Sequence, residues 1–152
     1  MFIDSMLQFS AAQAAFASGA DVISTNILDL NPDLAANAAN NGDPGVGEET
    51  TINVGITTAF SGGTSMQLVL QTDTNTNFST AMVEIPLTGA LPVATLVAGY
   101  NINNFLPESG LKRYIRLVYR NVGANVAGAV NAQLVKNPQL STGMVPAAFT
   151  VG

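Results

Sequence analysis

The chain has 152 residues, a length that suits one domain with its own hydrophobic core, and only 10% of its residues are charged. Its net charge is −5, with five basic residues and no His or Cys, which argues against most catalytic sites, disulfides, thiolate metal sites and nucleic-acid binding. No segment has the length of a membrane-spanning helix, and no secretory signal is evident. We therefore expect no enzyme activity, no cofactor or metal, and neither nucleic acid nor membrane as a partner.

The N-terminal part of the chain predicts an arm, a strand and a loop. Residues 1–20 have no convincing sheet pattern and hold a short Ala-rich helix candidate at 11–18, so they predict an N-terminal arm. Alternation of apolar and polar residues begins at 22–30, which predict the first strand. Residues 33–49 are rich in Asn, Ala and Gly and predict a long exposed loop.

Two clearly alternating runs follow, at 50–60 and 65–72. They flank the sequence Ser-Gly-Gly-Thr at 61–64, a pattern typical of a β-hairpin. Five further strands and a C-terminal arm complete the prediction: 81–87, 93–97, 99–106, 112–120 and 126–136, then the arm at 137–152. About eight strands predict an all-β protein, an antiparallel β-sandwich in one domain with its core at 21–136 and less than about a tenth of helix.

The segment after the second of these runs copies part of a calcium-binding loop. Asp73, Asn75, Asn77 and Glu84 have the spacing of ligands 1, 3, 5 and 12 of such a loop. Phe78, however, stands where the loop needs Gly for its sharp turn, and the flanks predict strands instead of helices. A polar connection whose Asp and Asn side chains bond their own backbone explains the pattern better.

Four of the five basic residues lie within 112–120. Strand alternation puts four side chains of this stretch on one face: Lys112, Tyr114, Arg116 and Arg120. Arg113 starts on the other face and could cap the strand end near Glu108. We expect this cationic strand to meet acidic carboxylates on a neighbouring subunit, and the simpler interpretation is a solvated face with weak ion pairs. The interface hypothesis predicts that Arg116→Ala with Arg120→Ala weakens assembly, more deeply at high salt, while the melting temperature stays nearly unchanged.

Aromatic residues on the predicted arms point to partners as well. Phe2, Phe9 and Phe16 lie in the N-terminal arm and Phe149 in the C-terminal arm. Exposed Phe is costly in water unless a partner buries it, so we predict that Phe2 and Phe149 contribute to an interface. A chain with so little surface charge is also expected to be covered by partners or by copies of itself.

Several sequence blocks lie in a specific order between Ser24 and Val135: STNILDL (24–30), LQTD (70–73) followed by FS (78–79), IP (85–86), LPVATL (91–96) with AGY (98–100), and RYIRL (113–117) with Tyr119. In this order and spacing, the chain resembles the capsid cement, or decoration, proteins of tailed bacteriophages of the Bordetella-phage type. The resemblance spans roughly three quarters of the chain, and it aligns least well at 33–49 and after Lys136.

The resemblance implies a fold, a location and partners. It implies a jelly roll of two antiparallel sheets that is made in the bacterial host cytoplasm and sits on the outer surface of the virion head. There it would bridge neighbouring major capsid proteins, stabilise the shell and form a homo-oligomer, a homodimer or a homotrimer. The hairpin predicted over 50–72 fits a meander or Greek key better than a pure jelly roll.

An alternative function also follows from an all-β sandwich of this size. A carbohydrate-binding module of a phage fibre or adhesin would need exposed aromatic residues on one face or a calcium site. Tyr100, Tyr114 and Tyr119 could stack on sugar rings, but Tyr residues in strands more often take part in core or cross-strand packing.

Overall fold

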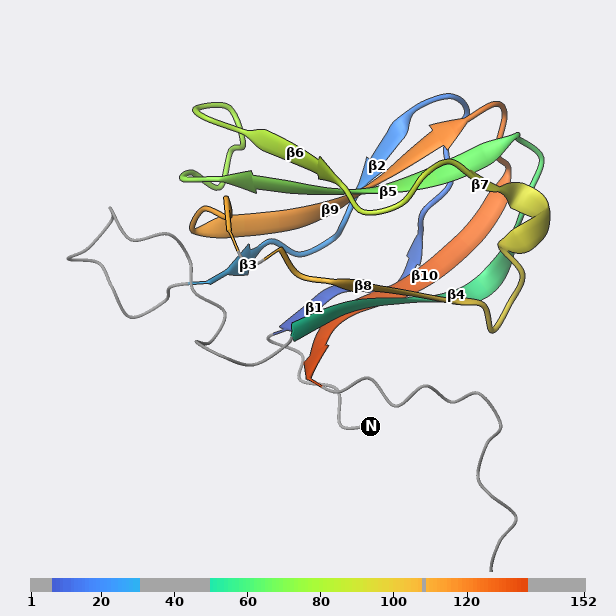
Figure 1. The fold of residues 1–152 in the computed structure, drawn as a ribbon. Helices are drawn as coiled ribbons and strands as arrows, with labels where there is room; N and C mark the ends of the chain where they lie inside the picture. The colour runs from blue at the N-terminus through green and yellow to red at the C-terminus, as the bar shows by residue number, and fades with distance from the viewer. Residues whose placement is uncertain (1–6, 31–49, 108, 137–152) are drawn as a thin grey trace, which may run out of the picture.

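The computed structural model describes residues 7–30, 50–107 and 109–136 and shows two antiparallel sheets packed face to face (Figure 1). The first sheet has the strand order β1 (Gln8–Ala14), β10 (Ala127–Lys136), β4 (Thr50–Ser61) and β8 (Asn101–Phe105). The second has the order β2 (Asp21–Ile23), β9 (Tyr114–Val122), β5 (Ser65–Asp73) and β6 (Val83–Pro86). Two short strands extend it: β3 (Leu28–Asp29) pairs with β9, and β7 (Leu91–Pro92) pairs with β5.

The pairing of the strands is that of a jelly roll. Among the eight strands on the two sheet paths, the first pairs with the last (β1 with β10) and the second with the seventh (β2 with β9). The third pairs with the sixth (β4 with β8), and the fourth with the fifth (β5 with β6). A chain folded back on itself and then wrapped into two sheets produces this nested set of antiparallel pairs. The predicted all-β, jelly-roll-like antiparallel sandwich is therefore confirmed, with ten strands in the described residues where about eight were predicted.

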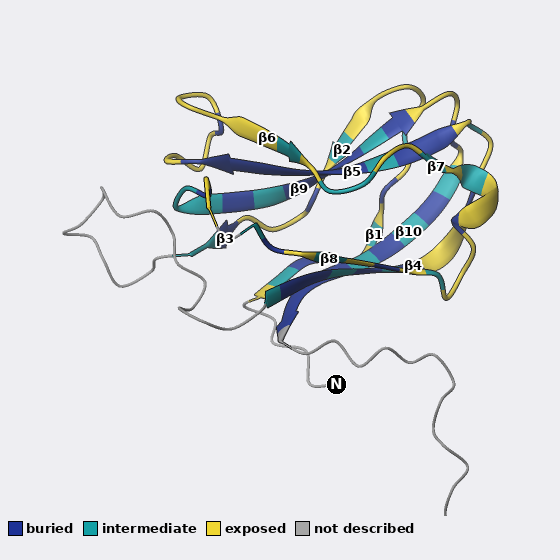
Figure 2. Cartoon of the chain, viewed as in Figure 1, coloured by how far each residue is buried: buried dark blue, intermediate teal, exposed yellow. Residues whose placement is uncertain are grey.

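Side chains from both sheets fill the space between them. Alternation along β4 sends Ile52, Val54 and Ile56 inward, and alternation along β9 sends Ile115 and Leu117 inward to meet them. Figure 2 shows the resulting stripes of buried and less buried residues along the central strands. Each fully buried aliphatic side chain of this kind contributes about 1.5–3 kcal/mol relative to the exposed state, so the two sheets form one stable unit.

One buried polar contact crosses this core. Tyr119 of β9 is fully buried, and its hydroxyl lies 2.8 Å from the hydroxyl of Ser10 on β1, in the opposite sheet. Ser10 in turn donates a hydrogen bond to Oε1 of Gln13 at 2.6 Å. Burial raises the pKa of Tyr119 well above its ordinary value, against the opposing effect of the Ser10 hydrogen bond, so the phenol stays protonated.

The hairpin predicted over 50–72 is wrong. β4 and β5 lie in different sheets, and the Gly-Gly sequence between them carries the chain across the end of the sandwich. Gly62 has φ +92, and a Cβ there would lie 2.4 Å from the carbonyl oxygen of Ala124 in the neighbouring connection. The glycines thus allow two backbones to approach closely and do not form a tight β-turn. Because there is no hairpin over 50–72, no feature of the described residues conflicts with a pure jelly roll.

The N-terminal prediction needs a second correction. The residues predicted as an arm with a helix at 11–18 instead include β1, which pairs with β10 at the edge of the first sheet. Phe9 is fully buried in the core, and Phe16 is about one-third exposed. Ala12 has φ 44 at a bulge in β1, so the regular alternation that marks a strand is broken there. Phe2 and Phe149, together with 137–152, lie outside the described residues.

Two smaller differences concern the other connections. The strand predicted at 22–30 is two short strands, β2 and β3, with an irregular segment between them. Residues 93–97 do not form a strand, because η2 (Val93–Thr95) is a turn of 3-10 helix. Within the described ranges there is no α-helix, and thus no helix that could cross a membrane.

Candidate functional site

The cationic strand predicted at 112–120 is β9, which starts at Tyr114. Its odd-numbered residues from Ile115 point into the core, and its even-numbered residues point to the outer face of the second sheet. Tyr114, Arg116 and Arg120 therefore share the outer face, as predicted. We call the outer face of β2, β9, β5 and β6 the cationic face.

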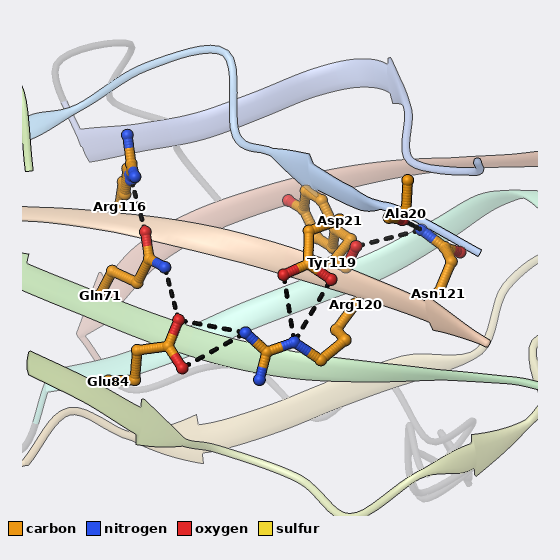
Figure 3. Close-up of polar contacts among 8 residues, drawn as sticks. All are labelled: Ala20, Asp21, Gln71, Glu84, Arg116, Tyr119, Arg120 and Asn121. Carbon is orange, nitrogen blue, oxygen red and sulfur yellow. Dashed lines mark hydrogen bonds and ion pairs between the residues drawn. The ribbon is translucent and has the colours of Figure 1, made fainter. Parts of the chain in front are cut away.

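Arg120 lies between two carboxylates of its own chain (Figure 3). Its Nε donates to the Asp21 carboxylate at 3.1 and 3.3 Å, and its Nη2 donates to Glu84 at 3.1 and 3.3 Å. Asp21 stands opposite Arg120 in the register of β2 with β9, whereas Glu84 comes from β6, beyond β5. The hydrogen bonds to Asp21 and then Glu84 raise the pKa of Arg120 above its ordinary value, so Arg120 links three strands as a permanent cation.

The network continues from Glu84 to Arg116. Gln71 of β5 donates from Nε2 to Glu84 at 2.7 Å and accepts from Nε of Arg116 at 2.7 Å, as Figure 3 shows. The hydrogen bond from Gln71, followed by that from Arg120, lowers the pKa of Glu84. The Arg116 guanidinium lies 4.1 Å from the ring centroid of Phe78, a cation–π contact. Partial burial lowers the pKa of Arg116, although the charge of Asp73 opposes that shift.

Arg113 and Lys112 precede β9 and have partners in the chain too. Arg113 forms a bidentate ion pair with Asp29 of β3. Its Nη2 donates to Oδ2 at 2.8 Å and its Nε donates to Oδ1 at 3.0 Å. Asp29 therefore takes the place predicted for Glu108, which lies outside the described residues. Arg113 also lies 5.0 Å from the ring of Tyr114, and the Lys112 ammonium donates to the carbonyl oxygen of Ala81.

These contacts change the interpretation of the cationic face. Arg120, for which the sequence predicts an acidic counterpart on a neighbouring subunit, meets two carboxylates of this chain, and Arg113 meets a third. Arg116 meets an amide and an aromatic ring instead of a carboxylate, and its charge is also close to Asp73. The basic side chains of 112–120 thus link β9 to β2, β3, β5 and β6 through ion pairs and hydrogen bonds. The expectation that Arg116→Ala with Arg120→Ala leaves the melting temperature unchanged no longer follows.

The loop that resembles a calcium site is held by its own backbone. The Asp73 carboxylate accepts hydrogen bonds from the backbone N–H groups of Thr74 at 2.6 Å, Thr80 at 3.2 Å and Ala81 at 3.3 Å. Burial alone would raise the pKa of Asp73, but these backbone donors outweigh burial and lower the pKa. This arrangement agrees with a polar connection that bonds its own backbone. Within the described ranges, no three His, Cys, Asp or Glu side chains gather as a metal site would need.

The tyrosines do not form the exposed platform that a sugar-binding face would need. Tyr119 is fully buried, and Tyr100 and Tyr114 are half-buried. Tyr100 packs against the core, and Tyr114 lies beside Arg113. In the described part of the chain, no observation favours stacking on sugars over packing.

Four residues of the network were not identified as partners of the cationic strand: Asp21, Asp29, Gln71 and Glu84. Gln71 pairs with Arg116 across β5 and β9, and Asp21 pairs with Arg120 across β2 and β9. The alternation of each strand predicts the face of these residues, but only the register between strands brings them together.

A scan of protein families found one that covers most of the chain. The family model described as Bbp16 matches residues 9–134, which include every strand from β2 to β9 and most of β1 and β10. Bbp16 is the name of a Bordetella phage protein, which indicates a phage structural protein associated with the virion. No curated protein matches the chain. Since the match covers well over half of the sequence, the chain belongs to the Bbp16 family.

Proposed function

We propose that this protein is a capsid cement, or decoration, protein, which binds the outer surface of an assembled phage head and stabilises its shell. The observation that supports this most is the membership of a phage family over residues 9–134. In this role the protein bridges neighbouring major capsid proteins and acts as a homo-oligomer. Because it binds the closed shell and not free capsid subunits, mass action shifts the equilibrium toward the intact head.

The geometry suits such a role. A double-sheet sandwich with a dense core is a rigid body, and rigid bodies lose little entropy when they dock. The charged side chains of the cationic face hold the sandwich together, so they contribute to a stiff scaffold and do not form a reactive cluster. Many such units, each bound weakly to adjacent subunits, would stabilise the shell through avidity.

The proposal is tested with heads that lack the protein. A phage from which the gene is deleted should produce heads that release DNA at lower temperature than heads of the parent phage. Adding the purified protein should restore the parental temperature, and the protein should appear on the outside of the particles in electron micrographs. Heads of equal heat stability with and without the protein, to which the purified chain does not bind, would overturn the proposal.

A further inference from the structure

β8 is an edge strand with one open side (Figure 1). It is the last strand of the first sheet and pairs, within the described residues, with β4 alone. Directly after β8, the N–H of Leu106 donates to the carbonyl of Thr50 at 2.8 Å. Because the hydrogen bonds of an antiparallel ladder recur at every second residue, the even-numbered residues of β8 bond to β4. The odd-numbered residues therefore direct their backbone N–H and C=O groups to the open edge: Asn101, Asn103 and Phe105.

The other edge strands have features that oppose pairing with a further strand. Register shifts interrupt the pairing of β1, and Ala12 there has φ 44. β6 contains Glu84 and Pro86, and β7 ends at Pro92. β2 has three residues and β3 has two. Bulges, prolines, charges and short strands are the means by which natural sheets keep their edges unpaired. β8 has five residues without charge or Pro, and its register with β4 has no shift.

The strands of the first sheet carry almost no charge. β1, β4 and β8 contain no Asp, Glu, Lys or Arg, and β10 has one such residue, Lys136, at its end. The ion pairs among the described residues join strands of the second sheet and Arg113, which precedes β9. Two copies of a chain with a net charge of −5 repel each other, and they do so least where neither copy presents a charge. The edge at β8 therefore suits contact between copies and leaves the ion pairs of the cationic face intact.

We infer that β8 pairs with β8 of a second copy, antiparallel and across a two-fold axis, so that the first sheets of two copies form one continuous sheet. This inference rests on the homo-oligomer of the proposed function and assigns its contact. An antiparallel edge is complementary to itself, because each copy offers the donors and acceptors that the other needs. The symmetric register places Asn103 opposite Asn103 of the second copy, and Phe105 opposite the second copy's Asn101. Phe105 is 66% exposed, and the contact removes part of its ring from water.

The test measures the dissociation constant of the dimer by sedimentation equilibrium of the whole purified chain. Asn103→Pro removes an N–H that faces the open edge and keeps the ladder with β4, and it should raise the constant about tenfold or more. Asn103→Lys places two like charges opposite each other at the axis and should also weaken the dimer. Val83→Lys is the matched control, because it adds the same charge at a 41% exposed position of β6, and the constant should change less than about twofold. Melting curves confirm that each variant folds.

Amide hydrogen exchange of the unaltered chain tests the register. Well above the dissociation constant, the N–H groups of Asn101, Asn103 and Phe105 should exchange slowly, because they donate to the second copy. On dilution below the constant, these three should exchange fast, while Ile102 and Asn104 stay protected by β4. Protection of the three odd-numbered residues that does not depend on concentration, or that is absent in the dimer, would contradict the pairing.

The possible results separate the inference from the proposed function. A chain that stays monomeric up to about 1 mM, a trimer, or a dimer that Asn103→Pro and Asn103→Lys do not weaken would overturn the inference. If a monomeric chain binds phage heads and these variants lose that binding, β8 pairs with a strand of the capsid protein, and the inference is overturned as well. A monomer that stabilises heads leaves the cement function standing. A dimer joined through β8 that does not bind heads supports the inference and refutes the cement function.

Discussion

Replacing Arg116 and Arg120 together with Ala tests whether the cationic face stabilises the sandwich. Loss of Arg120 removes two partly exposed ion pairs, each worth about 0.2–1 kcal/mol after solvent screening, and leaves the Asp21 and Glu84 carboxylates without their cation. Loss of Arg116 removes a hydrogen bond of about 1 kcal/mol to Gln71 and a cation–π contact of about 0.5–1 kcal/mol. Together the two changes should destabilise the fold by about 2–3 kcal/mol.

A loss of this size is easily measured. For a domain of this length, each kcal/mol corresponds to about 2–4 °C, so the melting temperature should fall by about 5–10 °C. Circular dichroism at 218 nm and urea denaturation would both report the change, and the urea slope should stay constant if only the folded state is affected. In about 1 M salt the difference should shrink, because salt screens the ion pairs but not the contact with Phe78.

A double Lys variant is the matched control. Arg116→Lys with Arg120→Lys keeps both positive charges but cannot form the forked contact with two carboxylates at once. It should recover about half of the lost stability. If the double Ala variant melts within about 2 °C of the parent protein, the network contributes little to the stability of the fold. The cationic face is then only a solvated surface.

Three further predictions follow from single positions. Gly62→Ala should lower the melting temperature by several degrees, since its Cβ would lie 2.4 Å from a backbone oxygen, whereas Gly89→Ala, with no atom within 4 Å, should have little effect. Tyr119→Phe should destabilise by about 1 kcal/mol in urea denaturation, because it removes the buried hydroxyl contact between the sheets. The ionised forms of Asp73 and Glu84 are favoured in the folded state, so their stabilisation is present above their ordinary pKa values of 3.8 and 4.5. This stabilisation should be lost as pH falls through the lower folded-state pKa values. Glu84→Gln should therefore make the melting temperature depend less on pH over this acidic range.

The sequence was sufficient to predict which side of a strand each residue occupies, but not which strands pair with each other. Alternation correctly placed Ile52, Val54 and Ile56 on one side of β4, and Tyr114, Arg116 and Arg120 on one side of β9. Each of these statements depends on a single strand and its period of two. The pairing of two strands depends on contacts between residues far apart in the chain, such as β1 with β10. A local pattern contains no information on such contacts.

The two larger errors of fold prediction have physical causes of the same kind. The sequence Gly62-Gly63 permits either a tight hairpin turn or a close crossing of backbones, and only the neighbouring connection at 123–126 decides between them. β1 was missed because its Ala-rich sequence has good helix propensity and its alternation breaks at the bulge beside Ala12. Burial of Phe9 in the core overrides that propensity, as tertiary contacts commonly do.

The shortage of charge predicts a surface that partners cover, and the arginines of 112–120 are the residues from which the sequence predicts that contact. In the folded chain, however, Arg113 and Arg120 meet carboxylates from strands that the sequence could not align with them. Because those charges are paired within the molecule, they contribute more to the stability of the fold than to the recognition of a partner.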